Sequence, residues 1–371
     1  MKRRILFIIL ILAIVCTILA PSVRAASQDE LIAEQETSAG IQSASEAIPT
    51  EVTSTLDKLG IDPDHPTAGM RSFSLSDLIG ILKSELFGVV SVPLRSLAAI
   101  LAVIFLTSML SSEKHRVLRA AGTAGAGVAV IAPVAALAVS AAETVSVCSV
   151  FISASIPVFG ALTVSGGYPV SSAFMSGCMV ALSEALSIIS SSVLVPIACV
   201  GLAFSAVGAF VPEMKTEKLA SGIRSFAIWS VGGALALYLT FIGIQSGITS
   251  SLDGLAKKTV NVTVSSVIPV VGGIISDASD TVLGAAELIK SGFGGFSLVV
   301  ILLIFAKPLL TAIVWAVTLR IADFAASSFG ADDISSLTGA AQKTVTVLIA
   351  VLASVAVALT VSVAVIVRLK G

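Results

Sequence analysis

The sequence predicts an all-α, polytopic transmembrane helical bundle, and its composition and the length of its apolar runs are the reasons. The chain has 371 residues, of which 56% are hydrophobic and 12% are charged. A soluble globular domain carries about 25% charged residues. Mean hydropathy is +1.04, and apolar runs of about 20 residues, the length that crosses a bilayer, recur along the chain. The partner that this composition indicates is the lipid bilayer, and a net charge of −1 argues against nucleic acid.

Residues 1–26 have the pattern of a secretory signal peptide. Lys2, Arg3 and Arg4 form a positive start, residues 5–20 are apolar, and small residues near Ala26 offer a cleavage site. An uncleaved signal anchor is the alternative. In both cases, the chain that follows from residue 27 is expected to start outside the cytoplasm.

Residues 27–92 are predicted to be an external polar segment. Its first part, residues 27–87, contains eleven acidic residues against Lys58, Arg71 and Lys83. The composition of residues 27–56 predicts disorder. Apolar residues at helical spacing over 74–92, after Ser74 as a cap, predict a helix on the membrane surface. The alternative is that this helix is the wet end of the first span.

Residues 93–371 are predicted to form the multi-span domain, with seven or eight spans after signal-peptide removal. The candidate spans are 93–111, 118–142, 144–164, 171–191, 193–211, 225–249, 294–319 and 344–367. The basic loops around Lys114 and Lys215 are expected in the cytoplasm by the positive-inside rule. Counting the predicted spans from these loops places Arg368 and Lys370 outside the cell, against the positive-inside rule. Three explanations stay open: an external tail, a membrane entry by 261–291, or a re-entrant span.

An amphipathic segment interrupted by Pro and Gly is predicted at 259–291. Asp277, Asp280, Thr281 and Glu287 recur at helical spacing and define one polar stripe on an otherwise apolar helix. Carboxylates on such a helix need water, a cation or a basic partner. The stripe is therefore a candidate cavity wall or subunit interface, and a solvated face of a surface helix is the alternative.

Two further charges are predicted inside spans. Glu184 is the only charged residue between 144 and 212, and Lys307 lies in the middle of 294–319. Contact between them would offset the cost of burying both, which makes a Glu184–Lys307 pair a hypothesis. Glu143 is expected to mark a turn between two spans, and Gly294–Gly295 the end of one.

Catalytic, metal-binding and cofactor-binding arrangements are not expected. The two histidines, His65 and His115, lie in polar segments, and the cysteines fit no metal spacing. The sequence therefore predicts a protein that is not an enzyme.

The segment that carries the stripe also resembles a known family. Its pattern is an Ile-Pro-Val-Val-Gly run followed by spaced acidic residues, and it is similar to the signature of the stage III sporulation protein AE family. The residues that carry the resemblance are Ile268, Pro269, Val270, Val271, Gly272, Asp277, Ala278, Asp280, Thr281 and Val282.

This resemblance implies a function that hydropathy cannot supply. It implies a non-enzymatic subunit of the channel or secretion-like complex that links mother cell and forespore, in the mother-cell membrane around the forespore. Such a complex is needed for endospore development and late forespore gene expression. The implied partners are the other membrane subunits, and a homo-oligomer stays open. The alternative is a stand-alone secondary transporter or permease, which would show broken helices at matching positions in two halves.

Overall fold

The computed structural model describes Glu36, residues 39–109, 116–165, 168–188 and 272–368, and separate positions between 196 and 244. The regular elements in these residues are helices, which confirms the predicted all-α class. The principal helices are α3 (Ile41–Ser45), α4 (Thr50–Lys58), α5 (Pro66–Ser72), α6 (Leu75–Met109), α7 (Arg116–Ser165), α8 (Pro169–Ile188), α11 (Gly272–Ser328) and α12 (Asp332–Arg368). Five helices of the described residues are long and apolar enough to cross a membrane. This finding supports a membrane bundle but does not confirm seven or eight spans.

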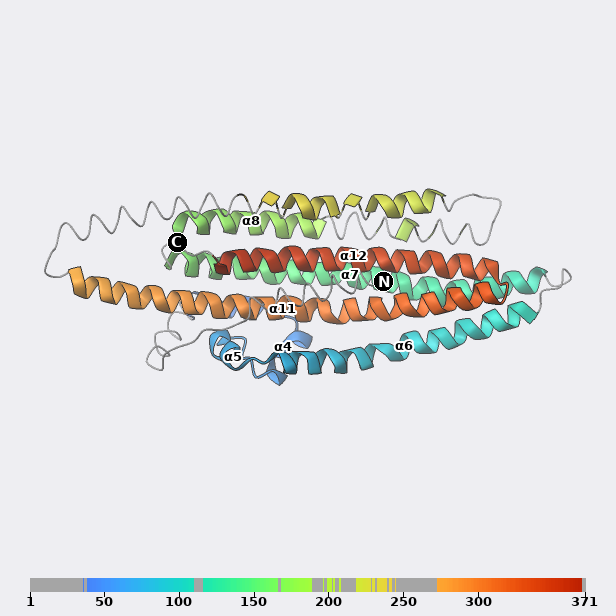
Figure 1. Cartoon of the computed structure of the whole chain (residues 1–371), viewed down its shortest axis with the longest axis horizontal. Coiled ribbons are helices and arrows are strands. Elements are labelled where there is room, and N and C mark those ends of the chain that lie inside the picture. Colours follow the sequence, from blue (N-terminus) through green and yellow to red (C-terminus); the bar gives the residue numbers. More distant parts are fainter. Residues whose placement is uncertain are drawn as a thin grey trace.

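The long helices α6, α7, α11 and α12 lie side by side along the molecule (Figure 1). The closest pair is the antiparallel hairpin of α11 and α12. Its turn contains Gly330, whose φ of 72° lies in the left-handed region that glycine adopts without strain. Only residues 329–331 separate the two helices, so both are longer than the predicted spans 294–319 and 344–367.

Two contacts fix the register of α6 against its neighbours. The ring of Phe105 meets Phe329 edge to face, with centroids 6.4 Å apart. Thr107 packs against Gly122 near the start of α7. The end of α6, the start of α7 and the α11–α12 turn therefore lie at one end of the bundle, which we call the turn end.

The structure contradicts two predictions about α7. Residues 118–142 and 144–164 are not separate spans, because both belong to one helix of 50 residues. Glu143 does not mark a turn, since it is an exposed residue in the middle of that helix. A single charged residue can stay on a helix surface without ending it, and neither Pro133 nor Pro157 interrupts α7. Prolines are tolerated in membrane helices because neighbouring groups can satisfy the freed carbonyls.

The first predicted span also begins earlier than expected. Residues 75–92 are not a separate surface helix but the first half of α6, which continues past Pro93 without a break. Ser74 precedes it as predicted, and its Oγ accepts a hydrogen bond from the N–H of Ser76 at 3.3 Å. The alternative, that this segment is the wet end of the span, therefore fits the structure.

The prediction of disorder over 27–56 is wrong for the part that the structure describes. Residues 41–58 contain α3 and α4, and their side chains Ile41, Ala44, Val52 and Leu56 are buried in the main hydrophobic core. Together with α5 they form what we call the cap, residues 39–72 with Glu36. The cap packs on α11 and α7. Its polar composition gave no indication that four well-spaced apolar side chains would be covered by another part of the chain.

The order of the helices bears on the three explanations left open for the C-terminus. α6 and α11 both run toward the turn end, and α12 runs back from it (Figure 1). Arg368 therefore lies at the end opposite the start of α7, which follows the basic segment around Lys114 that is predicted to be cytoplasmic. This order favours an external tail over the other two explanations.

Labelling tests this assignment. With Cys16, Cys148, Cys178 and Cys199 replaced by Ser, a Lys370→Cys variant produced in non-sporulating cells is expected to react with a membrane-impermeant maleimide while the cells are intact. A Ser112→Cys variant is expected to react only after the cells are opened, because the basic segment around Lys114 is predicted to be cytoplasmic. Labelling of both positions at the same rate in intact cells would contradict the helix order.

Candidate functional site

The predicted polar stripe lies on the first part of α11. The backbone is helical from Gly272 onward, so Asp277, Asp280, Thr281 and Glu287 lie on a helix, as the spacing predicted. Their side chains, and those of Ala278 and Val282, are outside what the structure describes, as are residues Ile268, Pro269, Val270 and Val271. The helix begins at Gly272, immediately after the run that contains Pro269.

The segment that carries the stripe extends beyond α12. Gly294 of α11 packs against Val367, the residue before the last one of α12. The 22 residues of α11 before Gly294 therefore have no α12 beside them, a length of about 33 Å at 1.5 Å per residue. Figure 1 shows this end of α11 projecting past α12.

Gly294 and Gly295 do not end a span, contrary to the prediction. Both lie inside α11 and both are buried. A Cβ added at Gly294 would collide with the side chain of Val367. The glycine instead lets the two helix backbones approach, as small residues do at interfaces between membrane helices.

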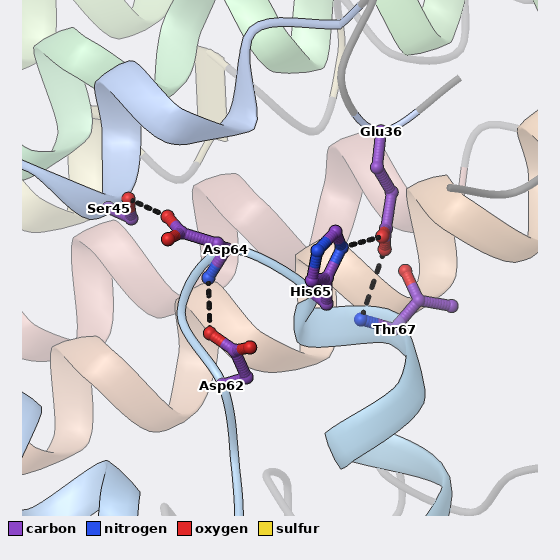
Figure 2. Close-up of polar contacts among 6 residues, drawn as sticks. All are labelled: Glu36, Ser45, Asp62, Asp64, His65 and Thr67. Carbon is purple, nitrogen blue, oxygen red and sulfur yellow. Dashed lines mark hydrogen bonds and ion pairs between the residues drawn. The ribbon is translucent and has the colours of Figure 1, made fainter. Parts of the chain in front are cut away.

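The cap is held together by a buried carboxylate (Figure 2). Glu36 is only 3% exposed, and its Oε2 lies 3.3 Å from Nδ1 of His65. Its Oε1 accepts a hydrogen bond from the backbone N–H of Thr67 at 3.2 Å. Thr67 is the second residue of α5, which has no capping side chain of its own. Glu36 therefore satisfies a free N–H at this helix start, and the negative charge is favourable there.

A second set of bonds orders the loop before α5. Ser45 donates a hydrogen bond from Oγ to Oδ1 of Asp64 at 2.6 Å. The backbone N–H of Asp64 donates to Oδ1 of Asp62 at 3.0 Å. Figure 2 shows these residues beside the Glu36–His65 pair. Segments that are 19 and 29 residues apart in the chain are thereby joined into one unit.

The cap packs closely against α11 at one glycine. A Cβ built on Gly292 would lie 2.8 Å from both Oγ1 and Cγ2 of Thr67, and 3.0 Å from its Cα. Since one of these atoms belongs to the backbone, a rotamer change alone could not relieve the contact. Gly292 therefore permits the start of α5 to rest directly on α11.

The proposed Glu184–Lys307 pair is not what the structure contains. Nζ of Lys307 donates to Oε2 of Glu51 in α4 at 3.0 Å, whereas Glu184 is an exposed side chain on α8. The hypothesis rested on charge sign and depth in the sequence, and it took no account of a cap folding back onto α11. With side chains 54% and 77% exposed, the Lys307–Glu51 pair should contribute at most about 1 kcal/mol.

Sequence reasoning missed the Glu36–His65–Thr67 contact. The only local signal was Pro66 directly after His65, because proline is favoured at the first position of a helix. No spacing rule connects that start to a glutamate about 30 residues earlier. Within the described part of the chain, no group of three His, Cys, Asp or Glu side chains could hold a metal ion.

These features define a class of protein: an α-helical membrane bundle with a folded polar cap and a projecting helix that bears spaced acidic residues. A sequence model of a family described as stage III sporulation protein AE matches residues 64–369. The match covers more than half of the chain, so the chain belongs to the stage III sporulation protein AE family.

A curated relative agrees with this assignment. Stage III sporulation protein AE of Bacillus subtilis (strain 168) is 26% identical over 213 residues, which are 57% of this chain and 53% of that protein. The match therefore spans about half the length of the relative. No solved structure is similar enough to match.

Gly292 provides a test of cap docking. We expect Gly292→Ala to destabilise the docked cap by about 1–3 kcal/mol, because overpacking in a tight contact forces backbone shifts. Faster tryptic cleavage after Lys58 in the purified, detergent-solubilised protein would report the loss. Gly125→Ala is the matched control, since nothing lies within 4 Å of its added Cβ. Equal protection of Lys58 in both variants would contradict the close contact.

Proposed function

We propose that this chain is a non-enzymatic membrane subunit of a complex that links mother cell and forespore during endospore development. The proposal places it in the mother-cell membrane around the forespore and makes late forespore gene expression depend on it. Its family supports a role in sporulation. The observation that carries the proposal is the length of the helices, because much of the bundle extends beyond a bilayer and is free to meet other subunits.

The helices are longer than a membrane is thick. At 1.5 Å per residue, the 50 residues of α7 span about 75 Å, whereas the hydrocarbon core of a bilayer measures about 30 Å. α6, with 35 residues, and α12, with 37, each exceed that core as well. The bilayer can therefore surround only part of the bundle.

On α11, side-chain exposure favours the turn end as that part. On α11, the exposed large apolar residues Val317, Ile321 and Phe324 all lie in the last third of the helix. On α6, Phe105, Leu106 and Met109 are exposed next to the turn end. In contrast, residues 293–301 of α11 are buried in the protein. Apolar side chains exposed on a membrane bundle are suited to contact with lipid. The buried stretch needs no lipid around it, because protein already covers its side chains.

Three exposed charged residues share one level of the bundle, while the exposed Arg95 and Arg320 lie between that level and the turn end. Lys83 is 22 residues before Phe105, and Lys307 is 22 residues before Phe329, so both lie about 33 Å from the contact between these two rings. The Thr107–Gly122 contact places Glu143 of α7 at nearly the same level. These three charges are exposed. We infer that this charged belt, residues Lys83, Glu143, Lys307 and Glu51, lies at the external membrane surface.

Beyond the belt, the bundle continues as an external projection that includes most of the cap and the stripe segment of α11. Carboxylates on a projecting helix attract basic partners by charge complementarity. The stripe of Asp277, Asp280, Thr281 and Glu287 is accordingly proposed as a contact with another subunit of the complex.

Labelling tests the position of the bilayer. In the cysteine-free background, produced in non-sporulating cells so that the protein lies in the outer cell membrane, Lys307→Cys is expected to react with an impermeant maleimide in intact cells. Val317→Cys should be protected, because it lies 10 residues closer to the turn end on the same helix and its side chain is also exposed. Protection of position 307 to the same extent as 317 would show that the bilayer covers the belt.

Counts of heat-resistant spores test whether the stripe is a contact with another subunit. An Asp277→Ala, Asp280→Ala double variant is expected to insert into the membrane normally but to reduce heat-resistant spores by at least about tenfold, the effect of losing about 1.4 kcal/mol of binding. Ser279→Ala, which lies between them but off the stripe, is the control. Normal spore counts in the double variant would remove the proposed contact. Recovery of the native protein without any other subunit would favour a stand-alone transporter.

A further inference from the structure

A lateral groove lies on the helix that covers residues Lys218–Tyr238. Its volume is about 500 Å³. Six of its lining residues carry no charge or polar side-chain group: Pro196, Val200, Leu219, Gly222, Ile223 and Phe226. The seventh is Lys218. Positions 218, 219, 222, 223 and 226 share one face of the helix, so the groove is a built feature of that face.

Contacts with α12 show which end of the bundle holds the groove. Ala227 packs with Val347 and Val351. Tyr238, 11 residues further on, shares a hydrogen bond with Ser362 at 2.5 Å. The helix therefore runs parallel to α12, and Lys218 lies level with the first turns of α12 near the turn end. With the bilayer positioned as proposed above, on which this step rests, Lys218 lies in the cytoplasmic half of the membrane, about 12 Å from the level of the first residue of α12. Its long side chain can extend from there toward the head groups.

The groove opens at the protein surface, where the proposed bilayer lies, and not into the protein. Leu219 and Phe226 are 56% and 62% exposed, although both line it. Lys218 is also exposed, and among the described residues its ammonium group forms no ion pair. An apolar channel within the bilayer with a single cation at the surface matches a molecule that has an apolar chain and an anionic head.

We propose that this groove binds one acyl chain of an anionic phospholipid and that Lys218 contacts the lipid phosphate. The apolar lining supplies the contact with the chain, because burial of each CH₂ group is favourable. The lysine supplies the preference for an anionic head over a zwitterionic one. A free phosphate ion would leave the apolar lining uncovered and would meet only one donor.

Gly222 allows the groove to be filled without disturbing its walls. Nothing lies within 4 Å of a Cβ added at this position. In the full-length protein purified in detergent, phosphatidylglycerol retained by the wild type is measured by native mass spectrometry. We expect Gly222→Leu to reduce its retention by at least about tenfold. Gly232→Leu is the matched control, because it lies on the same helix, has equal free space and does not line the groove.

Lys218→Gln tests the head group separately. We expect it to lower the preference for phosphatidylglycerol over phosphatidylcholine by about fivefold, the effect of one lysine near an anionic lipid. Inorganic phosphate added in excess should displace neither lipid. Competition by phosphate, unchanged preference in Lys218→Gln, or equal losses in the Gly222 and Gly232 variants would each overturn the proposal. Labelling of position 307 is independent of these results, so a failure here can be told apart from a misplaced bilayer.

Discussion

The close approach of other chain segments to α11 at two glycines is the constraint on which the rest of the structure depends. Gly292 accepts the start of α5, and Gly294, half a turn further, accepts the end of α12. A methyl group at either position would push away a neighbour that is held by many other contacts. α11 is therefore the common support of the cap and of the last helix, and the level of each along the bundle is fixed by it.

Much of the architecture follows from the sequence, because long apolar runs have few stable solutions in a membrane. Backbone polar groups cannot stay unpaired in hydrocarbon, so such runs must be helical, and the all-α class was predictable from that alone. The positions of the breaks between helices were less predictable from the sequence. Glu143 resembles a turn residue in a hydropathy profile, yet it lies on a continuous helix, because a charge on a surface position costs a helix little.

Hydropathy also cannot distinguish a side chain that faces lipid from one that faces protein. Residues 293–305 of α11 are as apolar as a membrane span, and in the structure nearly all of them are covered by neighbouring helices. Lys307 was consequently predicted in the middle of a span, whereas it pairs with Glu51 of a polar helix. The polar cap was harder still, because the contact of Glu36 with His65 and Thr67 joins distant segments that no local pattern connects.

The continuity of the helices has a mechanical consequence. α6, α7 and α11 pass the charged belt with no loop that could act as a hinge, and each is several turns longer than the bilayer. A stiff rod that is held near its middle turns as a whole. A partner that pulls on the projecting end of α11 would therefore shift Gly330 and its neighbours on the opposite side of the membrane, without any signal passing through a soluble messenger.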